Sequence, residues 1–348
     1  MNISNTDPRL VVPSYIGKPD VRFFDIDEFP FKIYGVSRFG DSYLRVDPSV
    51  AARLNSRAKK FNSATAGGRV RFKTDSPYVA VRVHIGEIYR VPMLTLTASA
   101  GLDLYEGEKF LGSFNPPYEL QSGGVYEAVI NLGEKRWREL TVNMPLYSGI
   151  NGLFIGISES AEISSAGEYK MPEPIVFYGS SITHGACASR PGTTFSAKLS
   201  RMLDADIVNL GFGAGCRGET ELAEYIGGLG AKLLVCAYDH NAPNSQKLSL
   251  THKPFYEALR RVSPDMPMLF VSRPEIEPTE DGEIRRGIIK ETVAYAASRG
   301  DKNVYYLNGG ELVRDFDLTH DLVHPNDLGQ HRIAVRLFDE ITKILGER

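Results

Sequence analysis

The stretch IVFYGSSITHG (residues 175–185) joins a short apolar run to a loop of small and polar residues. This run is the first of five, and helix-like stretches such as Glu283–Ser298 and Leu328–Leu345 lie between or after them. The five runs are Ile175–Tyr178, Ile207–Leu210, Leu233–Tyr238, Met268–Val271 and Val304–Leu307. Alternating strands and helices predict a parallel sheet covered on both faces. Functional side chains are then expected on the loops beyond the carboxyl ends of the strands.

In the preceding part of the chain, from about residue 20 to 160, apolar residues recur at every second position instead. Apolar residues alternate with others from Val79 to Ile85, and Leu94–Thr97 alternates in the same way. Further short runs are Leu102–Tyr105, Lys109–Phe114, Tyr126–Leu132, Trp137–Val142 and Gly152–Ile157. Because alternation is typical of half-buried strands, these runs predict a β-sandwich or jelly roll.

The length of 348 residues suggests two domains, at about 150 residues for each. The polar stretch Ser158–Pro174 lies where the period changes, and we interpret it as the linker between them. We therefore predict an accessory β-sandwich over residues 1–165 and a catalytic α/β domain over residues 166–348.

Charge and hydropathy exclude several classes of protein. Lys and Arg number 40 and Asp and Glu 43, a net charge of −3, so the clustered basic face of a nucleic-acid-binding protein is not expected. No apolar stretch approaches the roughly 18 residues of a membrane span. The N-terminus MNISNTDPRL lacks a signal-peptide pattern, which favours a cytoplasmic protein, or an exported one if a leader has been removed. The three cysteines form no CxxC pair, so neither a disulfide framework nor a metal clamp is expected.

The loops after the first three strands of the second half carry polar groups suited to catalysis. Ser181 follows the first strand, and a serine at such a turn can expose its hydroxyl near a helix N-terminus. Asn209–Cys216 follows the second strand, and its glycines let backbone N–H groups approach a ligand. Asn241 follows the third, where its amide can donate to an oxyanion. Each of these loops is also compatible with an ordinary turn.

The last loop reads DLTHDLVHPN (residues 317–326) and contains aspartate and histidine three residues apart. In a tight loop this spacing lets the carboxylate orient an imidazole that acts as a general base. Two registers fit, Asp317 with His320 and Asp321 with His324. A single pair of this spacing is also compatible with a purely structural role.

In this order, the four loops resemble the four sequence blocks of the SGNH (GDSL-type) hydrolase superfamily. The resemblance assigns Ser181 as the nucleophile, and the His-Pro-Asn continuation after Val323 selects His324 with Asp321. Gly101–Tyr105 reads GLDLY and resembles the motif of the GxDLY domain that precedes some SGNH esterases. The implied architecture of the second half is an α/β/α three-layer domain with a five-stranded parallel sheet.

The resemblance also places the oxyanion hole at the backbone N–H groups of Ser181 and Ala214 and the side chain of Asn241. Two positions depart from the family pattern. Ser180 replaces the Asp of the GDS motif, which is not the acid of the triad. Ala214 stands where the family usually has glycine, when the block is aligned from Asn209. Alanine can supply the N–H if its backbone angles allow, and the neighbouring glycines leave the register open by one residue.

The activity implied by the resemblance is acyl transfer through a Ser-His-Asp triad, without a metal or an organic cofactor. We expect hydrolysis of a short-chain ester, with acetyl as the leading acyl group, on a carbohydrate or another small molecule. The alternatives are an acyltransferase of the same fold and a non-catalytic carbohydrate-binding protein. The β-sandwich could bind glycan, form a dimer interface or wall the cleft, and the sequence gives no oligomeric state.

Several further residues are candidates for substrate contact. His184, Gly213 and Arg273 lie on loops near the expected site, but His184 also suits packing behind it, and a structural salt bridge is favoured for Arg273. Trp137 and Tyr147 are aromatic candidates for stacking on a sugar. We expect Trp137 to be buried in the sandwich, because it lies on an alternating run.

Overall fold

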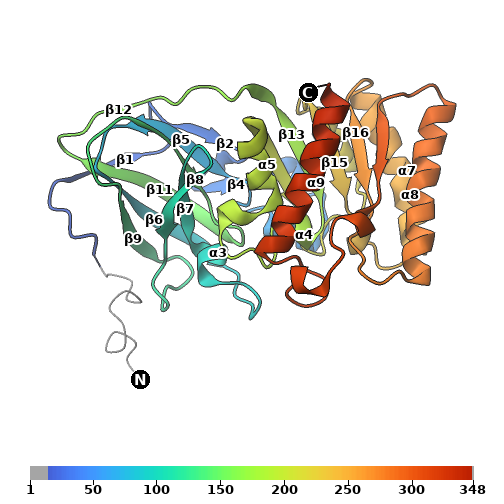
Figure 1. The fold of residues 1–348 in the computed structure, drawn as a ribbon, viewed down its shortest axis with the longest axis horizontal. Coiled ribbons are helices and arrows are strands. Elements are labelled where there is room, and N and C mark those ends of the chain that lie inside the picture. Colours follow the sequence, from blue (N-terminus) through green and yellow to red (C-terminus); the bar gives the residue numbers. More distant parts are fainter. Residues whose placement is uncertain (1–14, 347–348) are drawn as a thin grey trace.

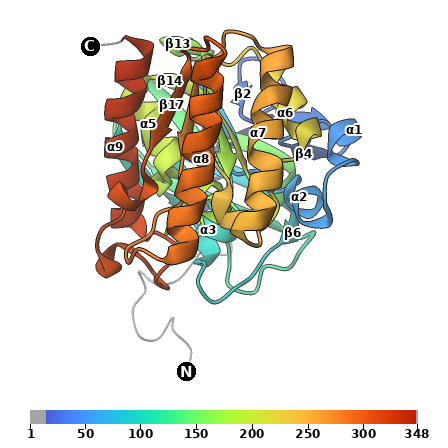
Figure 2. The same ribbon diagram turned by 90° about the vertical axis from the view of Figure 1, so that its right-hand side faces the viewer.

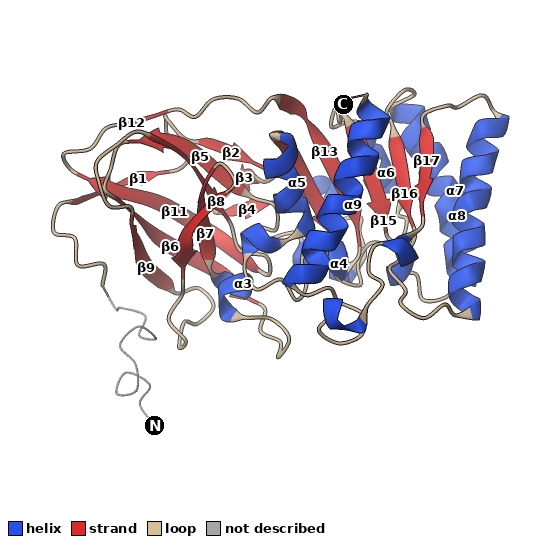
Figure 3. Cartoon of the chain, viewed as in Figure 1, coloured by secondary structure: helices blue, strands red, loops and turns tan. Residues whose placement is uncertain are grey.

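The computed structural model describes residues 15–346, which form a β-rich half and an α/β half (Figure 1). Strands make up most of the first half, and long helices flank the strands of the second (Figure 3). The prediction of two architectures in this order is confirmed. No helix in the part of the chain that the structure describes is long and apolar enough to cross a membrane.

The second half is built on a five-stranded parallel sheet, as predicted. Its strands, in spatial order, are β14 (Ala205–Gly211), β13 (Met171–Gly179), β15 (Leu233–Ala237), β16 (Met268–Val271) and β17 (Val304–Leu307). Successive residues of β13 face opposite sides, since Val176 and Tyr178 join one apolar cluster and Ile175 and Phe177 another. This burial on both faces explains why the strands read as continuous apolar runs.

Helices cover both faces of this sheet (Figure 2). On one side lie α5 (Phe195–Leu203) and α9 (Asp327–Leu345). On the other side lie α6 (Thr220–Gly227), α7 (Ser245–Val262) and α8 (Glu280–Ser298). Polar caps begin several of them: the Asn326 side chain accepts the N–H groups of Leu328 and Gly329 at the start of α9. The cap fixes where the loop before α9 ends, and that loop carries His324.

Two antiparallel sheets form the first half, which confirms the sandwich. One contains β1 (Val21–Asp25), β11 (Ser148–Ser158), β6 (Tyr78–Ile88) and β9 (Val125–Asn131). The other contains β12 (Ile163–Ser164), β5 (Arg69–Thr74), β10 (Arg138–Asn143), β7 (Leu102–Glu106) and β8 (Lys109–Phe114), with β2 (Lys32–Tyr34) also paired to β5. A small hairpin joins β3 (Ser37–Phe39) to β4 (Ser42–Leu44). Val81 of the first sheet and Phe72 of the second belong to one buried core.

Two local predictions for this half are wrong, and a third needs refinement. Leu94–Thr97 is not a strand: α3 (Leu96–Ala100) begins there, because the Thr95 side chain accepts the Ala98 N–H at 3.0 Å and caps the helix. Trp137 precedes β10 and is 50% exposed, so it is not a core residue. The predicted linker Ser158–Pro174 is partly structured, since β12 pairs with β5 and β13 begins at Met171.

The two halves share a hydrophobic cluster. Two short helices of the first half, α1 (Pro48–Ala51) and α2 (Ser56–Phe61), lie next to the α/β half. Phe61 and Leu146 belong to the same buried cluster as Leu210, Phe212 and other residues of the α/β half. The second half therefore does not bury all of its apolar surface by itself.

A buried carboxylate also joins the halves, and it belongs to the GLDLY motif. Asp103, on β7, accepts hydrogen bonds from Asn143 Nδ2 at 2.7 Å, from the Gly192 N–H at 2.7 Å and from Arg190 Nη1 at 3.0 Å. Gly192 and Arg190 belong to the α/β half, just before α5. Burial raises the pKa of Asp103, and these three donors oppose that effect. The aspartate of the motif thus connects the two halves through hydrogen bonds.

Replacing this carboxylate is expected to destabilise the protein. Asp103→Asn places an NH₂ group against donors that all point at the carboxylate, which leaves buried polar groups unsatisfied. We expect a loss of about 2–4 kcal/mol in the free energy of unfolding, measured by urea denaturation. Glu106→Gln, at the end of the same strand, breaks the exposed Glu106–Arg136 ion pair and is expected to cost at most about 1 kcal/mol. Equal losses in the free energy of unfolding for the two variants would contradict the role of Asp103 in connecting the two halves.

Candidate active site

The loop after β13 makes a tight turn into α4 (Ser181–His184), a helix of a single turn. Ser180 is its N-cap, and the Ser180 Oγ accepts the Ile182 N–H at 3.2 Å. A Cβ at Gly179 would lie 2.2 Å from Thr183 Oγ1, and one at Gly211 would lie 2.2 Å from the His184 backbone N. These two glycines therefore allow α4 to lie directly against the carboxyl ends of β13 and β14.

Ser181, His324 and Asp321 form one chain of hydrogen bonds. The Ser181 Oγ lies 2.8 Å from His324 Nε2, and His324 Nδ1 lies 2.8 Å from an Asp321 carboxylate oxygen. Of the two possible Asp/His pairs, the structure thus places Asp321 and His324 next to the serine. In the first register, His320 is exposed, and its backbone N–H donates to the His324 carbonyl at 2.8 Å. His320 contributes to the shape of the loop.

Asp321 is held in place by its own loop. Its second carboxylate oxygen accepts the N–H groups of His324 at 2.7 Å and Val323 at 3.2 Å. Partial burial raises the pKa of Asp321, but these N–H groups and the imidazole outweigh the burial and hold the pKa below its ordinary value. The carboxylate therefore stays ionised at neutral pH and can stabilise an imidazolium at His324.

The glycine-rich loop after β14 lies beside Ser181. A Cβ added at Gly213 would lie 3.6 Å from the Ser181 Cβ. Ala214 adopts a φ of +57°, in the left-handed region where glycine is favoured. Asn241, in the turn after β15, donates from Nδ2 to the Phe212 carbonyl at 3.0 Å and so braces this loop. Asn209 donates to the Thr183 carbonyl at 2.8 Å and accepts the Gly211 N–H at 2.9 Å, which ties the loop to α4.

Sequence reasoning missed Arg45, which lies beneath this loop and is only 3% exposed. Its guanidinium donates to the Gly211 carbonyl at 2.6 Å, to the Asn209 carbonyl at 3.3 Å and to the Phe61 carbonyl. It also lies 4.2 Å from the centre of the Phe212 ring. No carboxylate of residues 15–346 forms an ion pair with it, and burial lowers its pKa to about 9. More than 160 residues separate Arg45 from these β14 carbonyls, so no local motif could have revealed the contact.

A cleft of about 270 Å³ opens beside Ser181 and His324. From the α/β half it is lined by Ser181, Ala186, Gly213, Ala214 and His324. From the β-rich half it is lined by Arg57, Phe61, Tyr89, Val91, Met93, Leu94 and Tyr147. The β-rich half therefore walls the cleft, one of the three roles that the sequence left open, and its contribution is mainly apolar and aromatic.

The remaining candidates lie at different distances from the cleft. Gly213 and Tyr147 line it directly. His184 is buried behind it, where its Nε2 lies 2.7 Å from the Leu146 carbonyl and its ring stacks on Tyr147 at 3.9 Å between centroids. Burial lowers the pKa of His184 well below its ordinary value, so the ring is neutral. Arg273 pairs with Glu275 at 2.9 Å, in agreement with the salt-bridge interpretation. No group of acidic, histidine or cysteine side chains in residues 15–346 has the arrangement of a metal site.

The left-handed backbone at Ala214 is expected to affect the free energy of unfolding. A non-glycine residue in this region costs about 1–2 kcal/mol, whereas glycine loses about 0.4–1 kcal/mol through the entropy of the unfolded chain. We expect Ala214→Gly to raise the free energy of unfolding by up to about 1 kcal/mol, measured by urea denaturation. Ala52→Gly is the matched control: Ala52 has a φ of −59°, so the same change should destabilise. A loss of stability in both variants would refute strain at Ala214.

Comparison with known proteins supports the assignment of both halves. Residues 172–343 match the GDSL-like lipase/acylhydrolase family. Residues 21–163 match the GxDLY family, described as the N-terminus of SGNH-hydrolase-type esterases. No curated protein is similar enough in sequence to be matched.

Solved structures share the fold over nearly the whole chain. A protein from Bacteroides ovatus ATCC 8483 that is described as a GDSL-like lipase is 29% identical, with a TM-score of 0.84, over 94% of this chain and 98% of the other. The salicylyl-acyltransferase SsfX3 from a tetracycline biosynthetic pathway is 19% identical, with a TM-score of 0.78, over 94% and 98%. The acetyl xylan esterase Est2A from the rumen bacterium Butyrivibrio proteoclasticus is 13% identical, with a TM-score of 0.62, over 93% and 99%. Because sequence identity to the last two proteins is low, their similarity to this chain establishes the shared fold alone. The chain belongs to the SGNH (GDSL-type) hydrolase superfamily, and its first half is a GxDLY-type N-terminal domain.

Proposed function

We propose that this protein is a serine esterase that removes a short acyl group, with acetyl as the leading candidate, from a carbohydrate. The observation that carries the proposal is the hydrogen-bonded chain of Ser181, His324 and Asp321 at the edge of a cleft. The match of residues 172–343 to the GDSL-like lipase/acylhydrolase family supports hydrolase chemistry. Acetyl xylan esterase and other carbohydrate esterases share its fold.

In the proposed mechanism, the Ser181 Oγ attacks the ester carbonyl while His324 Nε2 takes the hydroxyl proton. Asp321 holds the imidazole and stabilises its charged form. The oxyanion accepts hydrogen bonds from the backbone N–H groups of Ser181 and Ala214 and from the Asn241 amide. Collapse breaks the bond to the alcohol, which takes the proton from His324. Water, deprotonated by His324, then hydrolyses the acyl-enzyme and releases the acid.

The lining of the cleft supports a carbohydrate as the alcohol. Tyr89, Met93 and Leu94 line the cleft together with Ser181 and His324. Aromatic and aliphatic surfaces of this kind suit the C–H faces of a sugar ring, while the sugar hydroxyls remain in water. Tyr147 is almost fully buried, so Tyr89 is the better stacking partner.

Removal of the nucleophile tests the mechanism. We expect Ser181→Ala to lower kcat for p-nitrophenyl acetate by several orders of magnitude, because the covalent step is lost. We also expect a fluorophosphonate probe to label the wild-type protein at Ser181 and to leave Ser181→Ala unlabelled.

Ser180→Ala controls for disruption of the turn, since it removes a helix cap without removing the nucleophile. It is expected to lose about 1 kcal/mol of stability and to keep the label. Turnover by Ser181→Ala at the wild-type rate would disprove the assignment. Failure of the wild-type protein to react with the probe would favour the non-catalytic carbohydrate-binding alternative.

A second candidate function is acyl transfer to an alcohol. The apolar wall of the cleft favours it, because an organic acceptor that fills the cleft displaces the water needed for hydrolysis. The salicylyl-acyltransferase SsfX3 has the same fold. Product analysis with p-nitrophenyl acetate and added methyl glycosides distinguishes the two. Hydrolysis gives mainly acetate at every acceptor concentration, whereas a transferase gives acetylated glycoside in proportion to the acceptor.

A further inference from the structure

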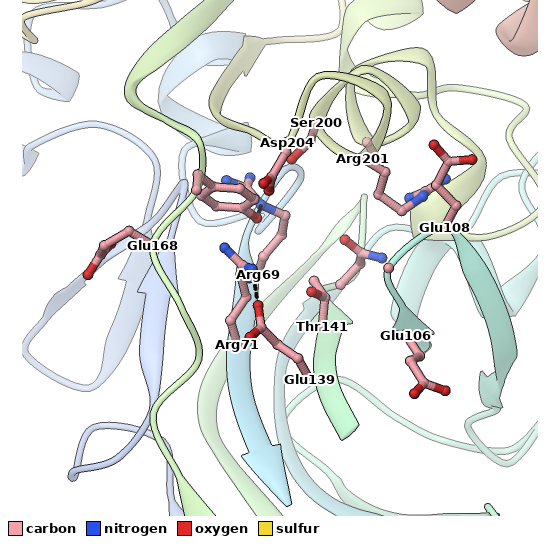
Figure 4. A pocket seen from close by; sticks show the side chains of 14 residues that line it. Arg69, Arg71, Glu106, Glu108, Glu139, Thr141, Glu168, Ser200, Arg201 and Asp204 are labelled. Atoms are coloured by element: carbon pink, nitrogen blue, oxygen red, sulfur yellow. Dashed lines mark hydrogen bonds and ion pairs between the residues drawn. The ribbon is translucent and has the colours of Figure 1, made fainter. Parts of the chain in front are cut away.

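A second cavity, of about 500 Å³, is lined by residues of both halves (Figure 4). Asp204, at its rim, directly precedes β14, whereas Ser181 lies just beyond the end of β13. Because β13 and β14 are parallel, the cavity and the serine lie at opposite ends of the sheet. Seven residues of β14 span about 20 Å. The cavity is therefore separate from the candidate active site.

The cavity is built from the outer face of the six-stranded sheet. Arg69 and Arg71 on β5 line it, and so do Glu139, Thr141 and Asn143 on β10. The residues between them, such as Val70 and Val142, point into the sandwich core, as the alternation of a strand requires. Helix α5 closes the opposite side with Ser200 and Arg201, and the turn between β7 and β8 adds Glu108 (Figure 4).

Interactions behind the cavity hold its walls in place. Arg69 pairs with Asp206 and donates to the Tyr169 hydroxyl at 3.0 Å. Asn143 donates to Asp103, and the Ser200 hydroxyl donates to the Ala205 carbonyl at 2.7 Å. These groups are buried and fixed, so a ligand would meet a surface that is already formed.

Several polar groups of the walls are not fully used by the protein. Arg71 is 7% exposed and its guanidinium lies 4.0 Å from the centre of the Tyr169 ring, so its Nε and Nη1, which have no hydrogen-bond partner within residues 15–346, are themselves buried. Its Nη2 is bound to Glu139, as the dashed line in Figure 4 shows. Arg201 gives one N–H to the Gly192 carbonyl at 2.8 Å and keeps others for a ligand. Thr141 presents a hydroxyl and Glu108 an exposed carboxylate.

The charges of the lining decide which ligand fits. Three arginines line the cavity together with five acidic residues, Glu106, Glu108, Glu139, Glu168 and Asp204. Three of these carboxylates are already paired with cations outside the lining, Glu106 with Arg136, Glu139 with Lys73 and Glu168 with Lys32, so the lining is nearly neutral. A ligand of either charge would therefore meet like charges as well as opposite ones. Each hydroxyl of a neutral sugar both donates and accepts, so it can bind carboxylates and guanidinium groups at once. We propose that this cavity binds one or two residues of a neutral saccharide. The proposal does not depend on the ester chemistry at Ser181.

Calorimetric titration of the full chain with xylobiose, cellobiose, maltose and N-acetylglucosamine tests the proposal. We expect at least one of them to bind. Thr141→Phe, which fills the cavity, should weaken that binding by at least about tenfold, or 1.4 kcal/mol, whereas Thr141→Ser should leave it within about twofold. Glu108→Arg, on an exposed turn, removes an acceptor without disturbing the core and should also weaken binding.

Further controls separate the two sites. Thermal unfolding verifies that each variant is folded, and Glu108→Arg keeps the test valid if Thr141→Phe does not fold. Tyr89→Ala alters the cleft beside Ser181 and should leave the affinity of the second cavity unchanged. The proposal is overturned if none of the four sugars binds, if Tyr89→Ala rather than the cavity variants abolishes binding, or if glucuronate or spermidine binds there more tightly than every neutral sugar.

Discussion

The guanidinium of Arg45 is the contact on which the geometry of the site depends. It joins the Phe61 carbonyl at the end of α2 to the Asn209 and Gly211 carbonyls at the end of β14. Burying a cation without a carboxylate partner costs several kcal/mol, so it persists only where carbonyl oxygens and an aromatic face surround it. Separation of the halves would leave those carbonyls bare. The loop that carries Gly213 and Ala214 is therefore fixed by a residue of the other half.

The SGNH blocks tolerate their two departures for different physical reasons. Ser180 caps α4 through its hydroxyl, and serine is among the best N-cap residues, so the turn keeps its shape without the usual aspartate. Ala214 keeps its N–H but adopts a backbone conformation that glycine adopts more easily. The first departure replaces one hydrogen-bonding group by another, whereas the second stores strain in the loop beside Ser181.

Much of the α/β half could be predicted from the sequence, because strands buried on both faces read as apolar runs and their following loops must meet at one end of the sheet. Ser181 was predicted as a candidate in this way, whereas the choice of Asp321 with His324 over Asp317 with His320 came from the resemblance to the SGNH blocks. The walls of the cleft were not: Phe61, Tyr89 and Tyr147 lie on the first half, and nothing in their local pattern indicates a partner so far along the chain. The error at Leu94–Thr97 arose because Thr95 caps a helix at a place where the apolar alternation also fits a strand. The error at Trp137 arose because the strand begins one residue later, at Arg138.

The hydrophobic cluster shared by α2, Leu146 and β14 has a consequence for how such proteins evolve. Each half supplies apolar surface that only the other covers, and Asp103 and Arg45 place polar groups across the same boundary. A gene fusion that exchanged one half for an unrelated module would expose this surface and leave buried charges unmatched. The two halves are therefore expected to be exchangeable only together, because neither covers its own side of the shared boundary.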